Sequence, residues 1–394
     1  MASALGGRGV AAGPWQGRGK VAGMEIPDPV ALAGSLIALD TRGGGERAAA
    51  DALAGLLDDG GFTVRTEPDP ADPARANLVA RRGDGRPPVT LTGHLDTVPA
   101  DPAGWSFDPH AGDVVDGRLR GRGSTDMKAG VAALVVAALR STPATPLQLV
   151  FTFGEETGGD GARLLTGLEP SPLLVVAEPT ANRVLHGHKG VLWLRLVQHG
   201  VSAHGSRPEL GDNALVALGR VAAALHDHTW PVSATHGAAT ANPGTLHAGL
   251  QPNLVPDRAE LEVDLRLVPG LDAAAARDEV ATVARAALTG TPHRGVPHVE
   301  VRLDLPAVGT DPADPRARAA ATALGHDGPA AFASYFTDAS VLVPALGDPA
   351  VLVYGPGDPE LAHVTDETCS AARVDEAAEA LTTALVRACA AAPA

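Results

Sequence analysis

The chain of 394 residues carries 31 Lys and Arg against 46 Asp and Glu, a net charge of −15, with 45% apolar and 20% charged residues. This composition is typical of a soluble globular protein, and the length indicates two domains or one domain with a large insertion. The acidic charge balance argues against a basic nucleic-acid-binding surface, so no nucleic-acid partner is expected. The longest apolar run, residues 131–139, is too short to span a bilayer, so no membrane partner is expected either.

The two cysteines, Cys369 and Cys389, are too few for a disulfide framework or a thiolate zinc site. They fit a reducing compartment, and we expect a cytoplasmic protein. Residues 1–23 are rich in glycine and lack the apolar core of a secretory signal, so this segment is predicted to be a disordered extension, with an expression scar or a mis-assigned start as the alternatives.

The first part of the chain alternates helical patterns with short apolar runs. A helix is expected over residues 46–57, ending at Gly60 and Gly61, and an apolar helix over 129–139. Buried strands are predicted over residues 89–92, 147–153, 173–176 and 350–353. Apolar residues on both faces of these strands are typical of a sheet covered by helices, so the fold class is α/β.

The pattern of predicted secondary structure changes at about residue 187. Strands are predicted at 191–198, 245–250, 260–268 and 298–303, and helices at 213–225 and 273–288. This β-α-β-β-α-β order is that of a split βαβ sandwich. We therefore expect an inserted α+β domain over 187–305, between two halves of a first domain at 24–186 and 306–394. Helices predicted at 316–324 and 374–391 return the chain to that first domain.

Polar residues follow each buried strand at its carboxyl end. His94 and Asp96 follow the first strand, Glu155 and Glu156 the second, Glu178 the third, and His363 comes after the fourth; Asp126 precedes the apolar helix. Ligands bind at the carboxyl ends of strands in open α/β sheets. Two imidazoles and three carboxylates suit zinc or another borderline divalent ion, and one carboxylate with two oxygens is able to bridge a metal pair.

Each signal alone also has a structural interpretation. Taken alone, His94 and Asp96 would fit a structural pair as well as a metal site. Glu155 and Glu156 would fit a solvated strand end, and Glu178 would fit a helix cap. The glycine-rich stretch 121–130 lacks the Gly-Lys-Ser/Thr ending of a phosphate loop, so that interpretation is rejected. His186 and His188 form a His-x-His pair without a carboxylate partner and are interpreted as structural. Only the joint arrangement of the strand-end residues favours a metal site.

These motifs resemble a known family, the dinuclear metallopeptidases that include acetylornithine deacetylase, succinyl-diaminopimelate desuccinylase, glutamate carboxypeptidase and aminoacylase. The similarity covers roughly residues 27–390, and the matching stretches are 93–99, 121–128, 154–158, 177–180, 202–209 and 355–366. The resemblance implies a zinc-peptidase-like catalytic domain with a mixed central sheet flanked by helices. It also implies that the inserted domain is a ferredoxin-like lid and dimerisation domain, so a homodimer is expected.

The resemblance further implies the roles of the strand-end residues. His94, Asp126 and Glu178 would hold one metal, and Asp126, Glu156 and His363 the other, with Asp126 bridging the pair. Asp96 would orient His94, and Glu155 would act as general base. The peptide bond between Asp126 and Met127 would be cis. The implied cofactor is two divalent metal ions, zinc in the first place, with cobalt or manganese as alternatives.

Five further residues are implied to contact the substrate or line its site. His204 would donate a hydrogen bond to the oxyanion, and in a dimer it would reach the site of the partner subunit. Arg266 and Asn253 would bind the substrate α-carboxylate, for which a guanidinium is well suited. Gly355 and Gly357 would line the site by allowing close approach of the backbone.

The function expected from the sequence is metal-dependent hydrolysis of the amide bond of an N-acyl amino acid, a small-molecule substrate. The stretch 187–213 resembles the deacetylase and desuccinylase branch, which favours an activity like that of acetylornithine deacetylase. A carboxypeptidase or dipeptidase on the same site is the alternative. A non-catalytic amino-acid-binding protein is a remote third, which the presence of Glu155 and the whole ligand set disfavours.

Overall fold

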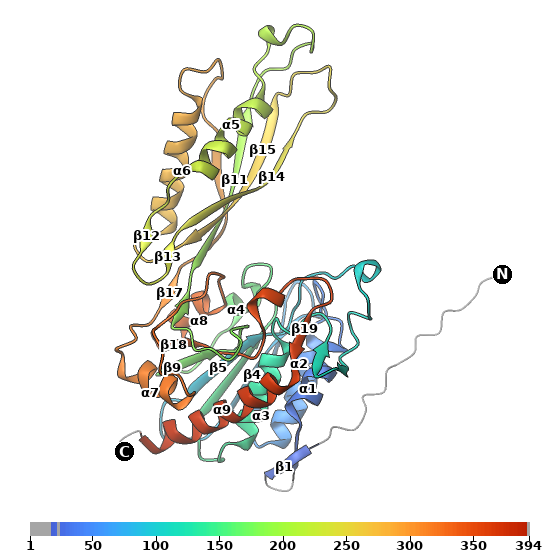
Figure 1. Ribbon diagram of the computed structural model, residues 1–394, viewed down its shortest axis with the longest axis vertical. Helices are drawn as coiled ribbons and strands as arrows, with labels where there is room; N and C mark the ends of the chain where they lie inside the picture. The colour runs from blue at the N-terminus through green and yellow to red at the C-terminus, as the bar shows by residue number, and fades with distance from the viewer. Residues whose placement is uncertain (1–16, 22–23, 392–394) are drawn as a thin grey trace, which may run out of the picture. The chain divides into compact units, whose positions relative to one another are not determined.

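The computed structural model describes residues 17–21 and 24–391 of the chain (Figure 1). The chain divides into two compact units. Unit 1 consists of Met1–Val184, Ala319–Asp327 and Tyr354–Ala394, and unit 2 of Leu185–Arg318 and Gly328–Val353.

Within the predicted extension 1–23, the described residues Gly17–Val21 form strand β1, which pairs antiparallel with β2 (Met24–Pro27). These residues are therefore a strand rather than disordered, because β2 supplies hydrogen-bond partners for their backbone. The other residues of this segment lie outside the described part of the chain.

Unit 1 contains a mixed sheet whose strands follow the order β9-β5-β8-β4-β3. Strand β5 runs parallel to both of its neighbours, β8 and β9, whereas β4 is antiparallel to β8 and to β3. The strands are β3 (Thr63–Pro68), β4 (Ala76–Arg82), β5 (Val89–His94), β8 (Leu147–Thr152) and β9 (Leu173–Val176). This sheet confirms the predicted α/β fold class and the strands predicted at 89–92, 147–153 and 173–176.

Helix α3 (Lys128–Arg140) forms the centre of the helical layer of unit 1. It contacts α1 (Pro29–Ile37), α9 (Ala371–Ala391) and strand β5, and Figure 1 shows α9 lying along it. Every residue of α3 before Arg140 is buried, which explains why its sequence is apolar on all sides. Helix α2 (Arg47–Asp59) packs against β3 and β4, close to the predicted bounds.

Helix α1 was not among the predicted elements, although it has a clear start signal. The side chain of Asp28 accepts hydrogen bonds from the backbone N–H groups of Val30 and Ala31, and Pro29 occupies the first helical position. An Asp N-cap followed by Pro is a strong helix start. The helix is short and apolar apart from Ser35, so it lacks the periodicity by which longer helices are identified.

A small second sheet in unit 1 has the order β19-β7-β6. It joins β19 (Thr368–Ser370) to β7 (Arg118–Arg120), and β7 to β6 (Val114–Val115). Unit 1 also holds α4 (Asp160–Leu164) and the 3₁₀ turns at Pro102–Gly104 and Pro359–Leu361. The β7–β19 pairing brings the chain that leads to Asp126 next to the segment that follows His363.

Unit 2 contains a four-stranded antiparallel sheet in the order β14-β15-β11-β16, with α5 and α6 on one face (Figure 1). The chain order is β11 (Gly190–His199), α5 (Ala214–Asp227), β14 (Thr240–Ala248), β15 (Arg258–Leu267), α6 (Ala273–Leu288) and β16 (His298–Leu305). The predicted β-α-β-β-α-β order is thus observed. Alternate residues of β15, such as Leu261 and Val263, are buried in the helix–sheet core, as a sheet covered on one face requires.

The remaining elements of the chain after residue 185 are short. They are β10 (Gly187–His188), β12 (Val232–Ser233), β13 (Gly237–Ala238), β17 (Val308–Gly309), α7 (Pro315–Ala323), α8 (Ala339–Ala345) and β18 (Ala350–Val353). Strand β18 has the predicted bounds and is fully buried. Unit 2 begins at Leu185 and extends past the predicted end at residue 305. Among the helices of residues 17–21 and 24–391, none has the length and hydropathy of a membrane-spanning segment.

Candidate metal centre

The candidate ligands of unit 1 lie at one edge of its sheet. His94 is the last residue of β5, Glu156 lies in the turn after β8, and Glu178 is the second residue after β9. Because these three strands are parallel neighbours, their carboxyl ends meet at the same edge. Asp126 lies two residues before helix α3, and His363 lies just after the 3₁₀ turn Pro359–Leu361.

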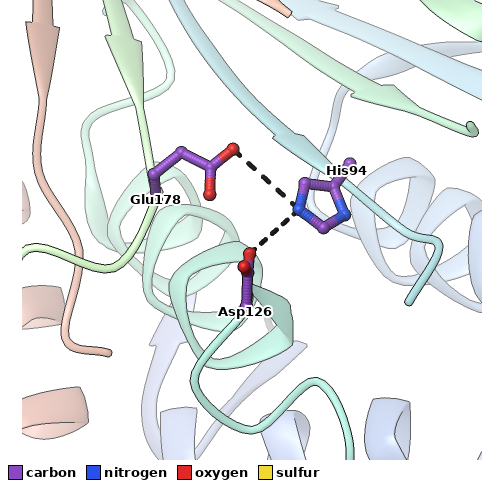
Figure 2. A group of neighbouring side chains, drawn as sticks. All are labelled: His94, Asp126 and Glu178. Atoms are coloured by element: carbon purple, nitrogen blue, oxygen red, sulfur yellow. Dashed lines mark hydrogen bonds and ion pairs between the residues drawn. The ribbon is translucent and has the colours of Figure 1, made fainter. Parts of the chain in front are cut away.

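The first group consists of His94, Asp126 and Glu178 (Figure 2). The Nε2 atom of His94 lies 3.1 Å from Oδ1 of Asp126 and 3.9 Å from Oε1 of Glu178. Both His94 and Glu178 are buried, and the ligand atoms of the group lie within 4.8 Å of one another. This span is little more than twice a zinc–ligand distance of about 2.0–2.2 Å.

The second group consists of Asp126, Glu156 and His363, again with ligand atoms within 4.8 Å of one another. The Nε2 atom of His363 lies 3.0 Å from Oε1 of Glu156 and 3.2 Å from Oδ2 of Asp126. The His363 side chain is half exposed, so this group faces solvent more than the first. The two oxygens of Asp126 thus point to different histidines, which is the geometry that a bridging carboxylate needs.

Burial and the crowding of carboxylates together shift the pKa values of the cluster. Burial raises the pKa of Glu178 well above its ordinary value, and the negative charge of Asp126 raises it further. Burial likewise raises the pKa of Glu156, and Asp126 again adds to the effect. The hydrogen bonds to Asp126 and Glu156 raise the pKa of His363 to about 10. Divalent cations would favour the ionised carboxylates and the neutral imidazoles of this donor set, so these residues fit a metal site.

Asp96 contacts the site in two ways. His94 Nδ1 lies 2.9 Å from the backbone carbonyl of Asp96, whereas the Asp96 carboxylate is 3.6 Å away, beyond a good hydrogen bond. The carboxylate instead accepts the backbone N–H groups of Glu155 at 3.2 Å and Glu156 at 3.1 Å. Asp96 therefore orients His94 through its main chain and fixes the turn after β8 through its side chain.

Glu155 lies in that same turn, directly before Glu156, and is 5% exposed. Its backbone is held by Asp96, so the position of its carboxylate depends on the turn that also carries a candidate ligand. The peptide bond between Asp126 and Met127 is cis, as the family resemblance implies.

The predicted substrate residues His204, Asn253 and Arg266 belong to unit 2. His204 is exposed, and its Nδ1 accepts a hydrogen bond from the backbone N–H of Ser206. Gly205 donates its N–H to the carbonyl of Asn253 at 2.7 Å, so the structure brings His204 and Asn253 into neighbouring loops. Arg266, on β15, donates to Asp264 at 2.9 Å.

Gly355 and Gly357 approach the backbone of the ligand-bearing loops. A Cβ atom on Gly355 would lie 2.6 Å from the carbonyl oxygen of Glu178, and one on Gly357 would lie 2.3 Å from that of Thr125. Close packing against the segments that carry Glu178 and Asp126 explains both glycines.

His186 and His188 are both buried in unit 2. Burial lowers the pKa of His188 to about 4, which keeps its ring neutral near pH 7. This agrees with the structural role expected from the sequence.

Sequence reasoning missed two buried charged residues next to the cluster. Glu367 accepts the backbone N–H of Asp126, and Lys128 donates from Nζ to the carbonyls of Leu36 and Leu39 at the end of α1. Burial lowers the pKa of Lys128 to about 8. For Lys128 a signal existed, because it is one of three lysines in the chain and directly follows Asp126-Met127. Glu367 carries no comparable signal.

Comparison with known proteins identifies the chain's relatives. The profile of Peptidase family M20/M25/M40 matches residues 90–387, which include all the candidate ligands. A probable carboxypeptidase of Aspergillus niger is 33% identical over 374 residues, covering 87% of this chain and 85% of that protein.

Solved structures share the fold over nearly the whole chain. An M20 family metallo-carboxypeptidase from Sulfolobus solfataricus has a TM-score of 0.72 at 15% identity, covering 92% of this chain and 99% of its own. The Bacillus subtilis YXEP protein, a dinuclear metal-binding peptidase of the M20 family, has a TM-score of 0.66 at 15% identity, covering 91% and 97%. The chain belongs to Peptidase family M20/M25/M40 and is a metallopeptidase-type hydrolase.

Proposed function

We propose that this protein hydrolyses the amide bond between an acyl or aminoacyl group and a C-terminal amino acid, using two divalent metal ions. The observation that carries the proposal is the shared carboxylate of Asp126, with one oxygen toward His94 and the other toward His363. Glu155 stands beside this arrangement on a fixed turn. A shared carboxylate with an adjacent Glu suits hydrolysis better than simple amino-acid binding.

Zinc is the metal we propose, with cobalt or manganese as alternatives. His94, Asp126 and Glu178 would hold one ion and Asp126, Glu156 and His363 the other. Imidazole and carboxylate ligands without thiolate suit zinc and its borderline neighbours. When bound, the ions would supply Lewis acidity toward a substrate carbonyl and lower the pKa of a water molecule.

Glu155 is the proposed general base. Its carboxylate would accept a proton from the attacking water and pass it to the leaving nitrogen, so that acyl transfer yields a carboxylate and a free amine. Asp96 supports this role because it holds the N–H groups of Glu155 and Glu156 together. The base and a ligand therefore share one rigid turn, which keeps their separation constant.

Recognition of the substrate is assigned to unit 2. His204 would donate a hydrogen bond to the developing oxyanion, and Arg266 and Asn253 would bind the α-carboxylate of the C-terminal amino acid. Support comes from the hydrogen bond that ties the loops of His204 and Asn253 together. We further propose that the inserted domain acts as a lid and dimerisation domain, with His204 serving the site of the partner subunit in a homodimer.

The acyl group distinguishes two forms of this reaction. The relative from Aspergillus niger is named a probable carboxypeptidase, which supports release of a C-terminal amino acid from a short peptide or acyl derivative. The resemblance of residues 187–213 to the deacetylase and desuccinylase branch supports the second candidate, removal of a small acyl group from an amino acid. Both reactions leave the same product on the amine side, an amino acid with a free α-carboxylate.

A substrate panel tests the proposal. It compares kcat/KM for N-acetylornithine, N-succinyl-diaminopimelate, other N-acyl amino acids and dipeptides, each with its C-terminal amide as a matched control. The amides should be about 30-fold poorer or worse, since losing one partner of a charge pair costs at least about 2 kcal/mol. Binding of these compounds without turnover would instead favour an amino-acid-binding protein, and equal rates for acids and amides would remove the role of Arg266.

A further inference from the structure

We propose that Glu367 is a positioning residue that holds the shared carboxylate Asp126 in place for the second metal group. This inference rests on the proposed function, because it concerns the same metal pair. Glu367 contributes no ligand atom to either group, yet it contacts the backbone at Asp126 directly.

The Glu367 side chain is fully buried, and each of its two oxygens has a separate set of donors. Oε1 accepts the backbone N–H of Thr125 at 2.8 Å and that of Asp126 at 3.1 Å. Oε2 accepts from Nη1 of Arg122 at 2.6 Å. One carboxylate thus fixes two successive peptide groups of the loop that leads into α3, immediately before the cis bond.

Arg122 in turn is held on both sides. Its guanidinium lies over the ring of Trp105, 5.2 Å from the ring centroid, and the side chain is 5% exposed. Its backbone N–H donates to the carbonyl of Pro109 at 2.8 Å. Because Arg122 cannot follow a displaced Glu367 freely, the pair forms a rigid support rather than a mobile surface contact.

The same support ties Asp126 to the segment that carries His363. Glu367 lies four residues after His363, and the backbone N–H of Gly121 donates to the Glu367 carbonyl. Next to it, Thr125 Oγ1 donates to the carbonyl of Thr368 at 3.0 Å. Two of the three candidate ligands of the second group, Asp126 and His363, are therefore joined through Glu367 and its neighbours.

The first group depends less on this connection. Apart from Asp126, its ligands are His94, the last residue of β5, and Glu178, which follows β9, and the sheet fixes the positions of both strands. Loss of Glu367 should therefore weaken the second group more than the first. A buried carboxylate with only a general structural role would lower stability without this difference between the two metals.

The test is titration of the metal-free full-length chain with Zn²⁺ in the presence of a chromophoric chelator, comparing wild type, Glu367→Ala and Glu367→Gln. Wild type should bind two equivalents. Glu367→Ala should weaken the second equivalent about 10–100-fold, the usual effect of removing a group that supports a metal ligand, and change the first much less. Glu367→Gln retains one oxygen for the two N–H groups, so its affinity for the second equivalent should lie between those of wild type and Glu367→Ala. This variant also provides the test if the alanine variant fails to fold.

Asp212→Asn is the matched control. Asp212 is another buried carboxylate that accepts a backbone N–H, from Arg294 at 2.8 Å, and pairs with a side chain, His293, at 2.8 Å. Asp212 belongs to unit 2, so the Asp212→Asn substitution should lower the melting temperature without changing the affinity for either Zn²⁺ equivalent. If each Zn²⁺ equivalent bound Glu367→Ala with the same affinity as wild type, the positioning role of Glu367 would be overturned and the proposed function would stand. Failure of wild type to bind two equivalents would overturn the proposed function as well.

Discussion

Replacing Asp96 by alanine removes the side chain that fixes the turn after β8. The carboxylate accepts the N–H groups of Glu155 and Glu156 at 3.2 and 3.1 Å, and it is 2% exposed, so water cannot readily replace it. The turn holds both the proposed base and a candidate ligand. We therefore expect this substitution to affect catalysis, metal binding and stability together.

The magnitude follows from the two hydrogen bonds. Each bond to a charged group contributes about 1.5–3 kcal/mol, so two bonds contribute about 3 kcal/mol at the lower end. Removing a negative charge from a carboxylate-rich cluster offsets part of this loss, which makes the lower end the better expectation. Loosening of Glu155 and Glu156 should reduce kcat or metal affinity about 10–100-fold, as for other groups that support metal ligands.

The assay measures urea unfolding and Zn²⁺ affinity of the metal-free protein, and kcat of the metal-loaded enzyme. Asp28→Ala is a matched control, because Asp28 also accepts two backbone N–H groups, at 3.0 and 3.1 Å, but caps helix α1. It should cost about 1 kcal/mol and leave metal affinity unchanged. If Asp96→Ala matched this control in kcat and in metal affinity, the support role of Asp96 would be refuted.

Three further outcomes are expected. Glu155→Gln should lower kcat about 10²–10⁴-fold while bound metal stays at the wild-type level, and a parallel loss of metal would argue against a role as base. His204→Ala should lower kcat about 10²–10³-fold at unchanged metal content, whereas an unchanged kcat would remove its oxyanion role. The folded-state pKa of His188, about 4, lies below its ordinary value of 6.5, so its stabilising effect is complete above pH 6.5 and lost as pH falls toward 4. The free energy of unfolding of wild type should fall by about 3 kcal/mol from this cause between pH 7 and pH 4. Urea unfolding of His188→Gln should not show this loss, and equal pH dependence in both proteins would contradict the assignment.

Elements with a strong and uninterrupted pattern could be predicted from the sequence. Strands β9 and β18 and helix α6 have the predicted bounds, because runs of apolar residues or a regular helical period mark them from end to end. Strand β4 was missed, and so was its antiparallel partner β3 at the sheet edge. Their sequences mix apolar with charged residues, so pairing within the sheet decides their structure.

The candidate site divides in the same way. Three of the five candidate ligands, His94, Glu156 and Glu178, could be found because parallel strands place their carboxyl ends together, whatever the spacing of these residues in the chain. Asp126 and His363 lie in loops, and the family resemblance rather than strand order identified them as ligands. The support of the cluster could not be predicted. Glu367 and Thr125 are 242 residues apart, and the backbone contact of Asp96 with His94 depends on local geometry rather than residue type.

The central claim is tested most directly by titrating the metal-free protein with Zn²⁺ while turnover of an N-acyl amino acid or dipeptide is measured. The site geometry predicts that turnover is absent without metal and rises to a plateau when two equivalents per chain are bound. Asp126→Asn, which alters the one carboxylate shared by both groups, should lose high-affinity binding of both. Turnover by the metal-free protein, or two tight equivalents in Asp126→Asn, would contradict a dinuclear site built around this residue.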